Sequence, residues 1–222
     1  YSTTVFVSGS TDIVLYDNHI HHNGNFAISG EHDVHGIGAS NSHRMWIVDS
    51  HLHHNRGDSI QFGHKAGNTL GDFYIGRNEM HDDGENRVDI KETSNVVISE
   101  NTFYNAGSGY PHVVLHDCPE NAAVLYNNFS GGTGVESGSL ESACNSRTPV
   151  NLFIIGHDLA LISGWGSGNR YYVCGNTGRV DLDNQGSGTV ITSSLDQRCF
   201  DAFENVYGID LNNPGGGGQP PK

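Results

Sequence analysis

The feature that most constrains this fold is an internal repeat. Residues 88–103 (VDIKETSNVVISENTF) align without gaps on residues 5–20 (VFVSGSTDIVLYDNHI) and again on residues 37–52 (IGASNSHRMWIVDSHL). Residues 60–80 and 113–129 follow the same pattern with loop insertions. One position of each unit is an anchor Asn or Ser, and the anchors recur every ~23 to 32 residues, a period typical of solenoids. The anchors are Asn18, Ser50, Asn78, Asn101 and Asn127.

Each unit contains two or three short β-branched runs between polar turns, and no helical periodicity competes with them. Short strands that recur once per unit predict coils stacked over one continuous core. An all-β sandwich is the main alternative, but it does not explain why whole units align without gaps. We therefore expect an all-β protein, a single-stranded right-handed parallel β-helix. The anchor side chains are expected to form an amide ladder that satisfies backbone groups at the turns.

The length and the ends of the chain suggest one domain. A chain of 222 residues can bury a substantial core. We expect the β-helix to cover residues 1–212, with residues 201–211 as a short cap, and a Gly/Pro-rich linker or tail over residues 213–222. Because the strand pattern is already present at Tyr1, we interpret the chain as part of a longer helix.

The net charge restricts the classes of molecule that the protein can bind. The formal net charge is −14, which argues against nucleic acid, because phosphate binding depends on clustered Lys and Arg. An anionic polysaccharide would be repelled unless a cation intervened. No apolar run approaches the ~20 residues of a membrane span. We expect a monomer that contacts neither nucleic acid nor membrane.

The four cysteines suggest disulfides. Cys118 and Cys144 each lie the same distance after their anchors, Asn101 and Asn127. Equivalent positions on neighbouring coils are ~4.8 Å apart, close to the Cα separation that a disulfide accepts. We therefore predict a disulfide between Cys118 and Cys144. The two cysteines that are left, Cys174 and Cys199, would then form the second disulfide, and four buried thiols are the alternative. Disulfides would place the protein in an oxidising compartment, secreted and extracellular.

One strand differs from its equivalents. In residues 88–91, Val88 and Ile90 are expected to point inward and Asp89 and Lys91 outward. The outward column through Lys91 otherwise carries Ser8, Ser40, Gly63 and His116, which predicts a shallow groove. Lys91 could act as a base beside hard oxygen ligands for Ca²⁺. The candidate ligands are Asp82, Asp83, Asp89 and Glu92.

Asp89 and Lys91 also have a simpler interpretation. They could form an exposed salt bridge on the face of the strand, which would stabilise the protein by ~0–1 kcal/mol. A bare Asp89 would also keep Lys91 charged, which is wrong for a base, whereas bound Ca²⁺ would take up that carboxylate charge. The metal and the base therefore depend on each other.

Two further clusters are candidate sites. A cluster of His32, Asp33, His35 and Asp58 could be an acid/base set or a substrate subsite, with Gln61 and Arg56 as further substrate-binding candidates. The histidine-rich turns could bind Zn²⁺ or Cu²⁺. The absence of a compact HExxH or CxxC element favours solvated turn residues instead. These turns contain His19, His21, His22, His51, His53, His54 and His81.

One stretch of the sequence resembles a known family of enzymes. The run GENRVDIKETSNVVISENTF and the repeat around it resemble the right-handed parallel β-helix polysaccharide lyases of the pectate-lyase superfamily, over roughly residues 5–130. The chain is most similar to the calcium-dependent family 9 type, and less to the family 6 alginate lyase and chondroitinase B type. The resemblance implies Lys91 as base and Asp82, Asp83 and Asp89 as Ca²⁺ ligands. For the assisting arginine of the family 6 type, the candidates are Arg56, Arg77 and Arg87.

The expected function is cleavage of a uronic-acid polysaccharide by Ca²⁺-assisted β-elimination. Lys91 would remove the C5 proton, and water or His116 would protonate the leaving oxygen, with Arg87 as a further catalytic candidate. One alternative is a noncatalytic β-solenoid for carbohydrate binding or adhesion. Another is a hydrolase, which would need two carboxyl groups about 5–10 Å apart on one groove.

Overall fold

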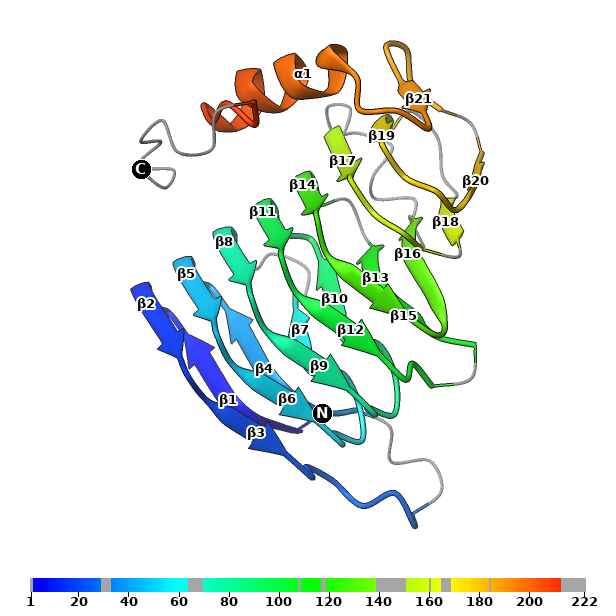
Figure 1. Cartoon of the computed structure of the whole chain (residues 1–222). Helices are drawn as coiled ribbons and strands as arrows, with labels where there is room; N and C mark the ends of the chain where they lie inside the picture. The colour runs from blue at the N-terminus through cyan, green and yellow to red at the C-terminus, as the bar shows by residue number, and fades with distance from the viewer. Residues whose placement is uncertain are drawn as a thin grey trace.

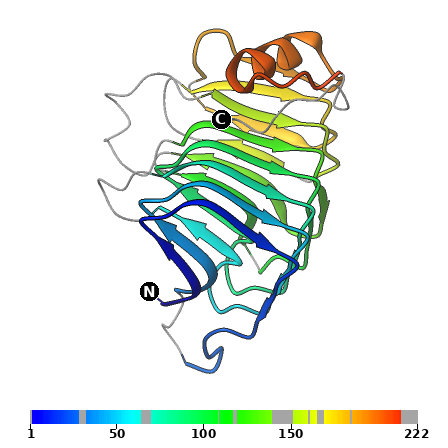
Figure 2. The same cartoon turned by 90° about the vertical axis from the view of Figure 1, so that its left-hand side faces the viewer.

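A computed structural model describes residues 2–28, 33–63, 70–107, 109–116, 119–138, 151–159, 161–164, 169–183 and 185–212. Its strands form three sheets in which every pair is parallel, and the chain winds from one sheet to the next in each coil (Figure 1). Figure 2 shows the coils as successive layers of one stack. The expected parallel β-helix is therefore confirmed.

Sheets A and B each contain eight strands, and sheet C contains five. In stacking order, sheet A consists of β1 (Ser2–Ser8), β4 (Val34–Ser40), β7 (Ile60–Phe62), β10 (Val88–Lys91), β13 (Pro111–His116), β16 (Thr133–Gly138), β18 (Leu161–Gly164) and β20 (Arg179–Leu182). Sheet B consists of β2 (Thr11–Tyr16), β5 (His43–Val48), β8 (Gly71–Gly76), β11 (Ser94–Ser99), β14 (Glu120–Leu125), β17 (Asn151–Ile155), β19 (Arg170–Cys174) and β21 (Val190–Thr192). Sheet C consists of β3 (His19–His21), β6 (His51–His53), β9 (Glu79–His81), β12 (Thr102–Tyr104) and β15 (Asn128–Ser130).

The strand register follows the repeat. Val5 pairs with Ile37, Ile37 with Ile60, and Ile60 with Val88, so the aligned apolar positions form one inward column. Because side chains alternate along a strand, the residues between them point outward. The core consists of these stacked columns, and a second column on sheet C runs through Ile20, Leu52, Met80, Phe103 and Phe129.

The anchor side chains form the expected ladder. The backbone N–H of Ser50 donates to Asn78 Oδ1 at 2.9 Å, and that of Asn78 donates to Asn101 Oδ1 at 2.9 Å. The N–H of Asn101 continues the series to Asn127 Oδ1 at 2.9 Å. His157 takes the next position, accepting from Asn127 N–H at 3.1 Å. Each anchor thus satisfies a buried backbone donor of the preceding coil.

The corners between strands use the left-handed backbone region. The residue before each anchor has a positive φ, as in Asp49 (φ 54°), Arg77 (φ 55°) and Glu100 (φ 57°). A second such corner follows sheet C, at His22 (φ 57°), His54 and Asp82 (both φ 54°). These corners turn the chain sharply, so adjacent residues in the sequence can face opposite sides of the wall.

The C-terminal helix packs on the side of the last coils. Helix α1 (Gln197–Tyr207) begins after Asp196, whose carboxylate accepts the Arg198 N–H at 2.9 Å, and ends at Gly208 (φ 70°). Its buried residues pack on outward side chains of sheet B, among them Phe153 and Ile155. The expected cap is thus a helix laid on sheet B.

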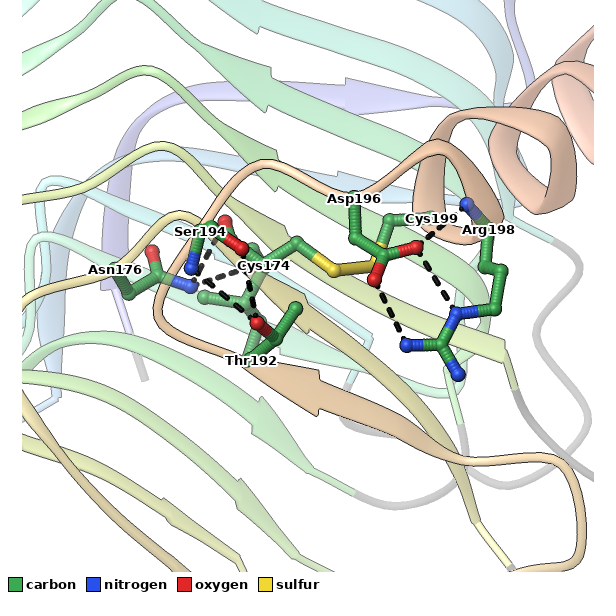
Figure 3. Close-up of a disulfide and its surroundings, with 8 residues drawn as sticks. Cys174, Asn176, Thr192, Ser194, Asp196, Arg198 and Cys199 are labelled. Carbon is green, nitrogen blue, oxygen red and sulfur yellow. Dashed lines mark hydrogen bonds and ion pairs between the residues drawn. A yellow bond between two sulfur atoms is a disulfide. The ribbon is translucent and has the colours of Figure 1, made fainter.

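The predicted disulfide Cys174–Cys199 is present and joins β19 to α1, with the Cα atoms 6.6 Å apart (Figure 3). Cys118 and Cys144 lie outside the described residues, as does the tail from residue 213. None of the described helices is long and apolar enough to cross a membrane.

Candidate functional site

The outer face of sheet A carries the column predicted around Lys91. Ser8 pairs with Ser40, and Lys91 pairs with His116, which pairs in turn with Gly138. Gly63, at φ 73°, lies beside Lys91, where an added Cβ would collide with the Lys91 carbonyl oxygen. Small residues therefore precede Lys91 on this face, as the sequence predicts.

Two carboxylates and an amide form a network beside Lys91. The Lys91 ammonium lies 2.7 Å from Asp89 Oδ2, with 19% of the Lys91 side chain and 7% of the Asp89 side chain exposed. Gln61 Nε2 donates to Asp58 Oδ2 at 3.1 Å and to Asp89 Oδ2 at 3.4 Å. Since one nitrogen reaches both oxygens, these lie no more than about 6.5 Å apart. Asn86 N–H donates to Asp58 Oδ1 at 2.8 Å and fixes that carboxylate.

His35 and Glu85 complete the cluster at the corner that leads into sheet A. Ligand atoms of His35, Asp58 and Glu85 all lie within 4.8 Å of one another. His35 Nδ1 lies 3.0 Å from the Asp58 backbone nitrogen, which donates to it, and 3.1 Å from Asp58 Oδ2. A chain of contacts thus joins four predicted residues, His35, Asp58, Gln61 and Asp89, to Lys91.

Sequence reasoning missed Glu85. It lies just before the strand, in the segment equivalent to the one that contains Asp58, because Glu85 N–H donates to the Gly57 carbonyl. The equivalence between coils could have identified Glu85 from the sequence. An acidic residue one coil away from Asp58 would be stacked next to it.

Burial and mutual repulsion alter the acidity of this cluster. Burial, reinforced by the Asp58 charge, raises the pKa of Asp89 to about 7. Burial, reinforced by the charges of Asp58 and Asp33, raises the pKa of Glu85 to about 7. Crowded carboxylates that resist ionisation in this way would be relieved by a bound cation.

The structure does not bring the four predicted Ca²⁺ ligands together. No group of three ligand atoms within 4.8 Å in the described residues contains Asp83, Asp89 or Glu92. Asp83 turns into the wall, where it accepts from Ser59 Oγ at 2.5 Å and from Asn55 N–H at 2.8 Å. The physical reason is the left-handed corner at Asp82, which separates the two neighbouring aspartates.

The other members of that set face elsewhere. Asp82 lies on the sheet C side of the corner, with Oδ2 2.6 Å from His81 Nδ1. Glu92 occupies the next corner, at φ 48°, on the far side of Lys91. Of the four predicted ligands, Asp89 alone belongs to the cluster formed with Asp58 and Gln61.

Arg87, a predicted catalytic residue, is buried in the wall. Its side chain is 0% exposed and lies 3.8 Å from the Asp83 carboxylate inside the corner. Its guanidinium donates to the carbonyl oxygens of Glu85, at 2.9 Å, and Asn105. Arg87 therefore has a structural role. Arg56, a predicted substrate contact at the same corner, places its guanidinium 5.3 Å from the centre of the Phe26 ring.

His116 lies where the sequence places it. It follows Lys91 in the outward column and has Nε2 3.4 Å from Glu136 Oε1 on β16. Only 13% of its side chain is exposed. An imidazole beside the lysine can exchange a proton with a bound molecule.

The cluster has the donor chemistry of a hard cation. Asp58, Glu85 and Asp89 supply carboxylate oxygens, the ligand type that Ca²⁺ prefers. Among the described residues, Asp89 Oδ1 is buried and has no hydrogen-bond partner, so one ligand oxygen is available. Asp58 and Glu85 lie close enough, with His35, to share one ion, whereas Asp89 belongs to no such group in the described part of the chain and is linked to Asp58 through Gln61.

Fold and site together define a class, the parallel β-helices that carry ionisable residues on the outer face of one sheet. A family model described as a right handed beta helix region matches residues 1–148, and the chain belongs to this family. The right-handed fold predicted from the repeat is thus confirmed. A search of curated proteins and a search of solved structures each found no match.

Proposed function

We propose that this protein is a secreted, monomeric polysaccharide lyase that cleaves a uronic-acid polysaccharide by β-elimination. The observation that carries the proposal is Lys91, whose ammonium lies 2.7 Å from Asp89 on an outward strand bordered by small residues. A polysaccharide chain can lie across such a shallow column. The disulfide Cys174–Cys199 supports an extracellular location.

The cation set of the proposal is Asp58 and Glu85, with His35 beside them, in place of Asp82 and Asp83. Asp89 lies next to this set, linked to Asp58 through Gln61. Bound there, Ca²⁺ would pair with the uronate carboxylate and make the adjacent C5 proton more acidic. Lys91 needs its neutral form to accept a proton, and neutralising the Asp89 charge would remove one interaction that favours the protonated form.

The chain's own residues supply the proton transfers. Lys91 Nζ would take the C5 proton, so that the C5–H electrons form the C4=C5 double bond while the C4–O bond breaks. His116, next to Lys91 in the column, would give a proton to the leaving oxygen. Gln61 positions Asp89 by donating to it at 3.4 Å.

The test measures the ultraviolet absorbance of the unsaturated product on pectate, alginate and glycosaminoglycans. Activity should disappear with EDTA and return with CaCl₂. Lys91→Ala and Lys91→Arg should both be inactive, because a guanidinium does not accept a proton near neutral pH. The matched control is Asp181→Asn, a substitution in the outward column of sheet A far from Lys91. A Lys91→Arg variant that still forms unsaturated product would contradict the mechanism.

One observation favours a second candidate, a glycoside hydrolase. Asp58 and Asp89 lie within reach of the single Gln61 nitrogen, a separation of the kind that paired catalytic carboxyl groups use. The raised pKa of Asp89, about 7, would suit a general acid. A hydrolase would release reducing ends without unsaturated product and would not need CaCl₂. The same substrate panel therefore separates the two chemistries.

A further inference from the structure

Histidines gather on the outer face of sheet C, away from the site on sheet A. Seven of the 14 histidines of the chain lie on or directly after three neighbouring strands, β3, β6 and β9. We call these seven the histidine strip. It consists of His19, His21, His22, His51, His53, His54 and His81.

The strip is ordered in columns. His21, His53 and His81 stack face to face, with ring centres 5.0 and 4.9 Å apart and planes within 4° of parallel. His19 stacks on His51 at 4.9 Å in the neighbouring column.

Ring nitrogens from different coils also face each other. His19 Nε2 lies 2.8 Å from His53 Nε2, and His51 Nε2 lies 2.8 Å from His81 Nε2. A neutral imidazole has one N–H donor and one lone pair. Each contact can therefore hold one proton or, in its place, direct nitrogen lone pairs at one cation.

The nitrogens converge in groups of three. Ligand atoms of His19, His51 and His53 lie within 4.8 Å of one another, and so do those of His51, Glu79 and His81. His51 belongs to both of these groups, and His54, His81 and Asp82 form a third group of the strip. A carboxylate orients the second group, because Asp82 Oδ2 lies 2.6 Å from His81 Nδ1 and leaves His81 Nε2 facing His51. Such carboxylate–histidine pairs commonly fix metal ligands.

We propose that the histidine strip binds one transition metal ion of the Zn²⁺, Ni²⁺ or Cu²⁺ class, with His51 as the shared ligand. Imidazole nitrogen suits these ions, whereas Ca²⁺ prefers oxygen, so this site is chemically distinct from the carboxylate cluster on sheet A. The ion bridges neighbouring coils at the end of sheet C where β3 is the edge strand. It therefore fastens the first coils together.

The test titrates ZnCl₂ into the chelator-treated whole chain by calorimetry. One ion per chain is expected, with a rise in melting temperature, because the ion binds only the folded strip. His51→Asn should weaken binding at least about tenfold, since it removes one of three ligands. The matched control is His22→Asn, which lies in the strip but outside both groups, at a φ of 57° that Asn tolerates.

Two more variants keep the test decisive if His51→Asn does not fold. His19→Asn should weaken binding if the ion lies between the first two coils, and His81→Asn if it lies between the second and third. Either loss supports the site and places the ion. Binding that survives in both variants, or in a folded His51→Asn protein, overturns the proposal. So does an equal loss in His22→Asn.

Discussion

Two columns of polar side chains run along this stack, one inside the wall and one outside, and they behave differently. The inner anchor ladder continues from Ser50 through Asn101 to His157 and Asn176, and each member accepts a hydrogen bond from the preceding coil. The outer histidine strip ends with β9, after which Tyr104 occupies the position next to His81.

The ladder continues along the stack and the histidine strip does not, because only the ladder satisfies backbone hydrogen-bond donors. The ladder meets a need that recurs in every coil, since a buried backbone N–H without an acceptor costs about 1–3 kcal/mol. Outward positions have no such need, so three coils of histidine require another cause, and the proposed ion supplies one. The carboxylates beside Lys91 are a local outward feature of the same kind.

The largest effect should come from a buried charge. Arg87→Met would leave the Asp83 carboxylate buried without its counter-charge, at 3.8 Å in the native wall. Removing one partner of a buried ion pair costs about 3–5 kcal/mol of unfolding free energy. Urea denaturation measures this loss.

The double variant Asp83→Asn/Arg87→Met provides the control. It removes the orphaned charge and should recover part of the stability. A double variant no more stable than Arg87→Met would contradict the electrostatic explanation.

The second-largest loss of stability is expected from a change in the anchor ladder. Asn101→Leu keeps the side-chain size but removes the acceptor for Asn78 N–H and the donor to the Ile75 carbonyl, both at 2.9 Å. The buried N–H of Asn78 then lacks its acceptor, and the free energy of unfolding should fall by about 1–3 kcal/mol. The matched control, Asn128→Leu, lies exposed on sheet C and should change it by under about 0.5 kcal/mol. Equal losses in the two variants would refute the distinction between inside and outside.

His157 makes the ladder sensitive to pH. It accepts from Asn127 N–H through Nδ1 and donates from Nε2 to the Val124 carbonyl at 2.9 Å, which fixes the neutral ring. Burial lowers the pKa of His157 below its usual value of 6.5. Below about pH 6.5 the unfolded chain therefore binds a proton that the folded chain does not, so stability falls as the pH falls.

His157→Asn restores the residue found at the other anchors and should reduce this slope by up to about 1.4 kcal/mol per pH unit. Above about pH 7 the slope should not change. Denaturation curves from pH 7.5 to about pH 5 measure it. An unchanged slope below about pH 6.5 would show that His157 does not contribute.

The sequence predicted those features that follow from stacking alone. Inward and outward positions, the Lys91–His116 column and the anchor ladder all result from placing equivalent residues one coil apart. The pair Cys174–Cys199 was predicted by remainder and is present. His157 and Asn176 were missed as anchors because the aligned repeat units end at residue 129.

The corners limited the prediction of the site. Asp82 and Asp83 are adjacent in the sequence, but the left-handed backbone at Asp82 sends one carboxylate to sheet C and the other into the wall. Glu85 was missed for a related reason, because its position beside Asp58 depends on the path of the corner. Sequence periodicity describes strands and carries little information about turns.

The smallest effect should come from an exposed ion pair that resembles the buried one in composition. Arg77 forms two hydrogen bonds of 2.8 Å with Asp49 on the next coil, but 49% of its side chain is exposed. Arg77→Met keeps the apolar stem and should lower the free energy of unfolding by at most about 1 kcal/mol, because water and salt screen the charges. The Arg77 guanidinium holds the pKa of Asp49 below its usual value, so this small contribution should decrease as the pH falls below about 4 and should also decrease in high salt. A loss comparable to that of Arg87→Met would mean that exposure does not distinguish the two arginines.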